Sequence, residues 1–222
     1  MTPLPSRLTR AGVLCLLAGA IIGIGCATIR VAAPPEKTGT DVWQPAAQRG
    51  DAVAQLQMAL AYLAGSAGLP QDNAKALQYL GMAADNGNVD AQMILADASL
   101  KGTLGAPRDP QHARALLEQA AAHSPLAALR LADLLKAGVY LPKDTHQAAH
   151  WYEQSARAGN HFAAWRLAQL QETLPDGKVL AYAWYSASGN PDDAARVLKT
   201  LAPAQQSAAQ QQARRLQQEL KP

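Results

Sequence analysis

Aromatic and charged residues are both scarce in this chain of 222 residues. Aromatic residues make up 5% of it and charged residues 17%, whereas hydrophobic residues reach 49%, and much of that share is alanine. A core with so few large flat side chains favours closely packed helices over a sheet. The length is sufficient for one core of good size.

An excess of one charge sign is also lacking. The formal net charge is +3 at pH 7, and two of the positive charges, Arg7 and Arg10, precede the first apolar run. The rest of the chain is close to neutral, which argues against a nucleic-acid-binding protein and against a basic membrane-surface protein. The charge balance leaves the partner unspecified.

Cysteine occurs only twice, at Cys15 and Cys26. Because Cys15 lies inside the apolar N-terminal run, cleavage of this run leaves one cysteine and no internal disulfide. The folded part must then be held together by packing alone. An unpaired thiol is unfavourable in an oxidising periplasm unless it is acylated, and its other interpretation is a small apolar residue of a signal peptide.

Residues 1–25 have the pattern of a signal peptide or anchor. Arg7 and Arg10 precede the uncharged stretch AGVLCLLAGAIIGIG, which is short for a membrane span. Extension to Ile29 brings it near the ~20 residues that a spanning helix needs. Three outcomes stay open: lipidation of Cys26, cleavage after another small residue, or retention as an uncleaved anchor. Residues 26–45, with clustered Pro and Gly and little apolar patterning, are predicted to form a flexible tether.

A repeat of about 36 residues begins near residue 46. Four residue pairs recur at spacings of 37, 36 and 36 inside apolar helical patterns: Met58-Ala59, Leu95-Ala96, Leu131-Ala132 and Leu167-Ala168. A glycine follows seven residues after the first member in three copies, at Gly65, Gly102 and Gly138. A left-handed C-cap favours glycine, so each of them is predicted to end a first helix.

The loop after each glycine leads into a second helix. An aspartate stands two positions after a proline in three copies, at Asp72, Asp109 and Asp144. Such an aspartate can accept hydrogen bonds from the free N–H groups at the start of a helix. Gln147 lies three positions after Asp144, as in a capping box. The repeating unit is therefore helix, glycine, Pro-x-Asp, helix and turn.

The unit resembles the Sel-one-like repeats (SLR), which are relatives of the tetratricopeptide repeats. The stretches that carry the resemblance are AQLQMALAYLAG, LPQDNAKA and MAADNGN of the first copy, PKDTHQAAHWYEQSARAGN of the third and LAYAWYSASGN of the fourth. The resemblance implies an all-α fold, a right-handed α-solenoid of about four helix-turn-helix repeats over residues 46–190. Two departures, Ser124-Pro125 at one turn and the short loop LPDG of residues 174–177, affect the last repeat boundary.

The apolar side chains of the second helices also indicate a solenoid. Each second helix carries an apolar column that it cannot bury alone: Ala76, Tyr79 and Leu80, then Ala113, Leu116 and Leu117, then Ala148, Trp151 and Tyr152. Stacking of units buries a continuous seam. Residues 191–222 are expected to be a C-terminal capping helical segment, because the stretch from Pro203 is polar on most faces.

Catalytic and metal-binding signatures are missing from the sequence. His146 and His150 have the spacing of a zinc helix, but Gln147 stands where a metalloprotease would place its glutamate base. The stretch AGSAG of residues 64–68 lacks the first glycine of a nucleophile elbow and follows a helix rather than a strand. We therefore expect no enzymatic activity, no cofactor and no metal. The lesser alternative is an envelope enzyme with an unrecognised catalytic group.

The expected binding surface is the concave face, which the first helices line in related solenoids. Positions one before and two after the recurring Met or Leu should form two rows along it. The rows are Gln57, Ile94, Arg130 and Arg166, and Leu60, Asp97, Asp133 and Gln169. The alternative is that Arg130 and Asp133 form only an i, i+3 surface ion pair.

The stretch GIGC, ending at Cys26, resembles the bacterial lipobox, whose cysteine is lipidated. Ala27 follows it, which by analogy implies an outer-membrane lipoprotein facing the periplasm; an inner-membrane anchor and a soluble periplasmic protein are the alternatives. The sequence thus predicts a non-catalytic scaffold that binds protein partners on its concave face and the membrane through its N-terminus, with no nucleic-acid partner. The resemblance offers two roles, an assembly factor of an envelope machine or exopolysaccharide system, and an immunity protein that neutralises a secreted toxic lipase.

Overall fold

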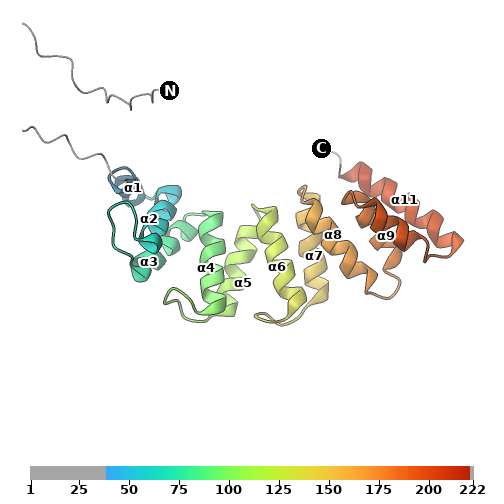
Figure 1. Ribbon diagram of the computed structural model, residues 1–222, viewed down its shortest axis with the longest axis horizontal. Coiled ribbons are helices and arrows are strands. Elements are labelled where there is room, and N and C mark those ends of the chain that lie inside the picture. The colour runs from blue at the N-terminus through green and yellow to red at the C-terminus, as the bar shows by residue number, and fades with distance from the viewer. Residues whose placement is uncertain (1–38, 221–222) are drawn as a thin grey trace, which may run out of the picture. The chain divides into compact units, whose positions relative to one another are not determined.

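The computed structural model describes residues 39–220, which form eleven α-helices and no strand (Figure 1). The chain divides into Met1–Glu36 and a compact unit, Lys37–Pro222, and all described residues belong to the second. The predictions for residues 1–25, for Cys26 and for the first part of the tether lie outside the described residues.

Eight of the helices form four pairs, one pair for each predicted repeat. The pairs are α2 (Ala52–Ala64) with α3 (Asn73–Asp85), α4 (Val89–Lys101) with α5 (Pro110–Ala121), α6 (Pro125–Ala137) with α7 (Thr145–Arg157), and α8 (His161–Glu172) with α9 (Lys178–Ala187). The principal contacts within this series join helices that follow one another in the chain, and the pairs are accordingly stacked side by side (Figure 1). The predicted all-α solenoid is confirmed.

The helix ends form as the repeat pattern predicts. Gly65, Gly102 and Gly138 end the first helices with φ values of 61°, 67° and 69°, in the left-handed region. At the start of the second helices, the side chains of three aspartates accept hydrogen bonds from backbone N–H groups: Asp72, Asp109 and Asp144. The recurring Pro-x-Asp motif is therefore an architectural element.

Gln147 differs from the predicted capping box. Its Nε2 donates to Oδ2 of Asp144 at 2.9 Å, instead of its carbonyl accepting from the Asp144 backbone. The backbone N–H of Asp144 already donates to the Leu135 carbonyl oxygen at 3.0 Å. The freed Oε1 of Gln147 accepts from Arg114 Nη2 at 2.7 Å, which links α5 to α7.

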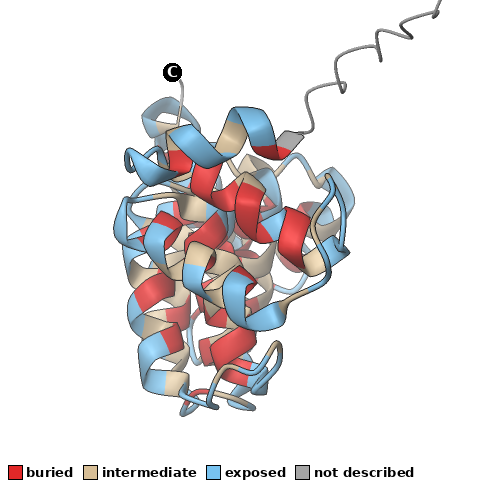
Figure 2. Ribbon diagram, turned by 90° about the vertical axis from the view of Figure 1, so that its left-hand side faces the viewer, coloured by how far each residue is buried: buried red, intermediate tan, exposed pale blue. Residues whose placement is uncertain are grey.

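The buried residues are mainly small and aliphatic, and they are distributed along the helices of the stack (Figure 2). In the first helices Met58, Leu131 and Leu167 are at most 1% exposed, whereas Leu95 is half-buried. In the second helices the predicted columns include the fully buried residues Ala76, Leu80, Ala113, Leu117, Ala148 and Tyr152. Alanine at many of these positions lets paired helices approach closely, so the core continues from one repeat to the next.

Helix α1 (Gly39–Gln48) occupies part of the expected tether, because residues 39–45 of the predicted segment 26–45 are helical. Ala47 of α1 is fully buried in a cluster with Met58 and Tyr62 of α2. Thr40 Oγ1 also donates to the Ala67 carbonyl oxygen at 3.2 Å. The short length of ten residues and the internal Pro45 hide this helix in the sequence, and tertiary contacts with the first repeat stabilise it.

The expected capping segment, residues 191–222, contains α10 (Pro191–Leu198) and α11 (Pro203–Glu219). Helix α11 returns along the chain to pack against α9. It is polar on most of its surface and buries Ala209, Ala213 and Leu216. Among the described helices, none combines the length and apolarity needed to cross a bilayer.

Candidate functional site

The eight residues of the two predicted rows lie on the first helices α2, α4, α6 and α8. Each of these helices contributes one residue to each row, and none of the eight is buried. Leu60 of α2 is 38% exposed. We call the surface that carries the two rows the first-helix face.

The two rows pair with each other across neighbouring repeats. Arg130 of α6 donates from Nη2 to both carboxylate oxygens of Asp97 of α4, at 2.6 and 2.7 Å. The two residues are 33 positions apart, so this contact joins consecutive repeats. Lys101 Nζ lies 3.9 Å from the same carboxylate.

The next junction repeats the arrangement and adds a buried tyrosine. Arg166 of α8 donates from Nε and Nη2 to Oδ1 of Asp133 of α6, the Nε bond measuring 3.0 Å. The hydroxyl of Tyr152 of α7 donates to the same oxygen at 2.5 Å. The Arg166 guanidinium also lies 6.0 Å from the ring centroids of Tyr152 and Phe162.

The i, i+3 ion pair between Arg130 and Asp133 is therefore not what forms. Among the described residues Arg130 is paired only with Asp97, and Asp133 is paired with Arg166. Periodicity places these residues on one face of their helix, but the way successive helices lie against each other selects the partner. At the first junction Leu60 and Ile94 occupy the corresponding positions, so that junction carries no charge.

Burial and the neighbouring charges shift the pKa values of the groups at the α6–α8 junction. Burial, together with the hydrogen bond to Asp133, raises the pKa of Tyr152. Burial and the Arg166 charge lower the pKa of Lys136, against the opposing effect of Asp133. Burial works to lower the pKa of Arg166 as well, but the hydrogen bond to Asp133 and the neighbouring charges raise it overall. Lys136 thus lies within electrostatic reach of the Arg166–Asp133 pair.

A groove of about 410 Å³ lies between α4 and α6 on the first-helix face. Its lining residues are Met93, Ile94, Asp97, Leu126, Leu129, Arg130 and Asp133. The predicted rows supply four of them. The apolar side chains come from the first two turns of the two helices, and the Arg130–Asp97 pair lines the groove beside them. This groove can bind a segment by burial of its apolar side chains, with the Arg130–Asp97 pair beside them.

Two exposed apolar residues of this face were missed by the sequence reasoning. Leu126 of α6 is 58% exposed and Phe162 of α8 is 53% exposed. They occupy the same repeat position, where α2 carries Val53 (61% exposed) and α4 carries Asp90. The sequence could have indicated them, because they stand four positions before the row of Gln57, Ile94, Arg130 and Arg166. Residues four positions apart lie on the same face of a helix, about one turn from each other.

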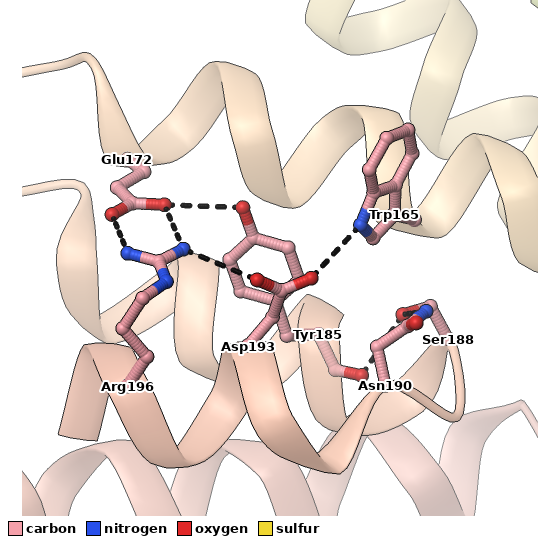
Figure 3. Close-up of polar contacts among 7 residues, drawn as sticks. All are labelled: Trp165, Glu172, Tyr185, Ser188, Asn190, Asp193 and Arg196. Carbon is pink, nitrogen blue, oxygen red and sulfur yellow. Dashed lines mark hydrogen bonds and ion pairs between the residues drawn. The ribbon is translucent and has the colours of Figure 1, made fainter.

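A second polar cluster ties α10 to α8 and α9 (Figure 3). Arg196 donates to both oxygens of Glu172 at 2.6 and 3.0 Å, and Tyr185 donates to Glu172 at 3.1 Å. Trp165 Nε1 donates to Asp193 Oδ2 at 3.1 Å. The hydrogen bond from Arg196 lowers the pKa of Glu172, and burial raises the pKa of Tyr185 to about 12. Each of these polar groups has a hydrogen-bond partner within the cluster. We therefore interpret the cluster as a structural contact that holds α10 against α8 and α9.

The other motifs singled out from the sequence lie in α7 and at the end of α2. His150 lies edge-on to the Trp151 ring, with centroids 5.3 Å apart. Over residues 39–220, no group of three or more His, Cys, Asp or Glu side chains is placed to hold a metal ion. Within residues 64–68, Ala64 ends α2, Gly65 is its C-cap, and residues 66–68 begin the loop to α3.

Comparisons with known proteins agree with the repeat architecture. The family model that describes the Sel1 repeat matches residues 52–88, 89–124 and 125–160. These three segments contain the first three helix pairs. No curated protein matches the chain.

Two solved structures are similar to the chain. A Sel1 repeat protein from Oxalobacter formigenes is 33% identical with a TM-score of 0.52, over 59% of this chain and 98% of that one. A protective antigen present in uropathogenic Escherichia coli strains, which displays an SLR fold, is 22% identical with a TM-score of 0.60. That alignment covers 80% of this chain but only 40% of the antigen. The repeats, their helix caps and these similarities lead to one assignment: the chain belongs to the Sel1 repeat family.

Proposed function

We propose that the protein is an interaction scaffold that binds a protein partner on its first-helix face. Sel1 repeat proteins generally act as protein-interaction scaffolds. The observation that carries the proposal for this face is the groove between α4 and α6, with exposed Leu126 on its rim and the Arg130–Asp97 pair beside it. Apolar contact area with flanking polar groups is the usual composition of a protein interface.

Site-specific photocrosslinking tests this face. A photoreactive phenylalanine analogue at Leu126 or Phe162 should give an adduct of discrete mass in cells that produce the full chain. The same analogue at Gln119 of α5 or Gln154 of α7, exposed positions on second helices, is the matched control. Adducts from the second helices alone would reject the first-helix face. Arg130→Glu or Arg166→Glu should abolish the adduct, because each places a like charge opposite an aspartate.

We propose further that Cys26 is lipidated and anchors the scaffold to the outer membrane, facing the periplasm. The proposal rests on the basic residues, the apolar run and the lipobox-like GIGC of the N-terminal sequence. Cys26→Ser should release the protein from sedimented membranes and remove labelling by a fatty-acid probe, while Cys15→Ser should leave both unchanged. Continued sedimentation of the Cys26→Ser protein would indicate an uncleaved anchor instead.

We propose that the scaffold takes part in the assembly of an envelope machine or exopolysaccharide system. The identity of the crosslinked partner distinguishes this role from that of an immunity protein. An envelope component joined through Leu126 or Phe162 supports an assembly factor, whereas a secreted lipase joined there would indicate an immunity protein.

A further inference from the structure

We infer that the segment bound on the first-helix face is acidic and carries an apolar anchor side chain. This inference deepens the proposed function and rests on it. Three features of the face carry it: the balance of charges around the Arg–Asp pairs, the hydrogen-bonding groups that stay uncommitted, and the separation of apolar from charged positions along the helices.

The charge around the two pairs is positive. Asp97 and Asp133 are each neutralised by one arginine, Arg130 and Arg166. Lys101 lies 3.9 Å from Asp97, and Lys136 interacts electrostatically with both members of the Arg166–Asp133 pair. Four cations therefore surround two carboxylates. The excess of two positive charges at this place contrasts with the near-neutral balance of the chain that follows Arg7 and Arg10 and attracts carboxylates of a partner.

The uncommitted hydrogen-bonding groups are mainly donors. Both hydrogen bonds of Arg130 come from Nη2, so within residues 39–220 its Nε and Nη1 donate to no protein group. Arg166 uses Nε and Nη2 and leaves Nη1. On the acceptor side, both oxygens of Asp97 and Oδ1 of Asp133 are occupied, and within residues 39–220 Oδ2 of Asp133 is the only oxygen of the two carboxylates that accepts no hydrogen bond. A segment that supplies acceptors, and carboxylates above all, can satisfy these donors with charge-assisted hydrogen bonds.

Apolar and charged positions form separate bands across the helices. Leu126 and Phe162 lie in the first turns of α6 and α8, whereas Lys101 and Lys136 lie in the last turns of α4 and α6. The Arg–Asp pairs lie between the two bands. Asp90, an exposed acid in the first turn of α4, repels carboxylates of a partner at that end of the helix. The acidic groups of the partner are therefore expected to bind toward the helix C-termini. The occupant is thus a segment with an apolar edge and an acidic edge.

The anchor position is the groove between α4 and α6. Met93, Ile94, Leu126 and Leu129 supply its apolar lining, and its volume of about 410 Å³ accommodates one or two large side chains. Phe162 stacks on Trp165 with ring centroids 5.4 Å apart, which gives a second apolar platform beside Arg166 on α8. A leucine or aromatic anchor side chain of the partner would fill the groove between α4 and α6. The acidic residues next to this anchor would face Arg130 and Lys136.

Selection of a random dodecapeptide library on the immobilised full chain tests the inference. We expect the selected peptides to combine Asp or Glu with Leu, Phe or Trp and to bind more weakly as salt concentration rises. Lys101→Gln with Lys136→Gln removes the excess charge and leaves both Arg–Asp pairs intact, so these peptides should bind it several-fold more weakly. Lys143→Gln with Lys199→Gln, exposed lysines outside the groove, is the control matched in charge and number.

The outcomes separate the two proposals. Peptides that need Leu126 and Phe162 but carry no acids, or that bind the Lys101→Gln, Lys136→Gln protein unchanged, overturn the acidic partner and leave the scaffold standing. If the selected peptides bind Leu126→Ser and Phe162→Ser variants as tightly as the natural protein, or if selection yields no binder, the first-helix face is rejected as the binding surface.

Discussion

Gly177 closes the short loop between α8 and α9, and it does so for a reason different from that of the other loop glycines. Gly65, Gly102 and Gly138 are needed because their φ is positive. Gly177 has a helical φ of −76°, but a Cβ built on it would overlap the Gln171 carbonyl oxygen. The close approach of two backbone segments therefore fixes the residue type at this position.

The Gly177→Ala substitution should destabilise the protein by about 2 kcal/mol, since the backbone it meets cannot move aside cheaply. Gly81→Ala is the control, because Gly81 lies within α3 and a Cβ there meets nothing within 4 Å. That change should stabilise the protein by about 0.5 kcal/mol through helix propensity. Urea unfolding of both variants makes the comparison, and equal effects of the same sign would contradict it.

Glu172 should make stability depend on acid pH. Its pKa in the folded protein is lowered, chiefly by the hydrogen bond from Arg196. A carboxylate with a lowered folded pKa adds stability above its unfolded pKa of about 4.3, and that stability is lost as pH falls through the folded pKa. The urea midpoint should thus fall over this interval, and Glu172→Gln or Arg196→Gln should flatten the fall. An unchanged pH profile in both variants would disprove the assignment.

At the scale of the elements, the junctions between first helices differ in what joins them. The α2–α4 junction carries Leu60 and Ile94, the α4–α6 junction a half-exposed Arg–Asp pair, and the α6–α8 junction an Arg–Asp pair that also holds a buried tyrosine. Exposed pairs contribute little to stability, whereas a carboxylate that satisfies a buried hydroxyl contributes more. The aspartate at the same position of two repeats, Asp97 and Asp133, is therefore expected to contribute unequally to the stability of the fold.

Asp133→Ala and Asp97→Ala make a matched test of this difference. Asp133→Ala leaves the buried Tyr152 hydroxyl and Arg166 without their acceptor and should cost about 2 kcal/mol. Asp97→Ala removes the acceptor only from half-exposed groups that water can reach, and it should cost less than about 1 kcal/mol. Both changes add the same helix-forming residue, so their difference in denaturant midpoint isolates the tyrosine contact. A larger loss for Asp97→Ala would contradict the structure.

The elements themselves could be predicted from the sequence because their signals are local. A glycine seven residues after the recurring Met or Leu, and an aspartate two after a proline, fix helix ends through backbone geometry alone. The partners of Arg130 and Arg166 could not be predicted in this way, since they depend on the packing of helices 33 residues apart. Helix α1 was not predicted for a related reason: it has only ten residues and an internal proline, and its stability comes from contacts with α2.

At the scale of the described unit, contacts run mainly between successive helices. Each repeat is supported by its neighbours, so stability is approximately a sum of local terms and can be lost locally. The C-terminal end is an exception to strict succession, because α11 packs against α9. The Glu172–Arg196 and Trp165–Asp193 contacts add polar ties there (Figure 3).

Leu216→Asp in α11 should therefore loosen one end of the stack and spare the other. Leu216 is 5% exposed, and a buried unpaired carboxylate is strongly unfavourable. We expect faster backbone hydrogen exchange in α9, α10 and α11 and unchanged exchange in α2, α3 and α4. Leu117→Asp in α5, where Leu117 is fully buried, is the comparison and should disturb the central repeats instead. Uniform loss of protection after Leu216→Asp would indicate a single cooperative core.

The Arg166 side chain is held in the free protein by Asp133 and by the rings of Tyr152 and Phe162. A long surface arginine ordinarily loses about 2 kcal/mol of rotamer entropy when a partner fixes it. Here folding has already imposed much of that loss. A partner that meets Arg166 encounters a preorganised donor and retains more of its contact energy as affinity.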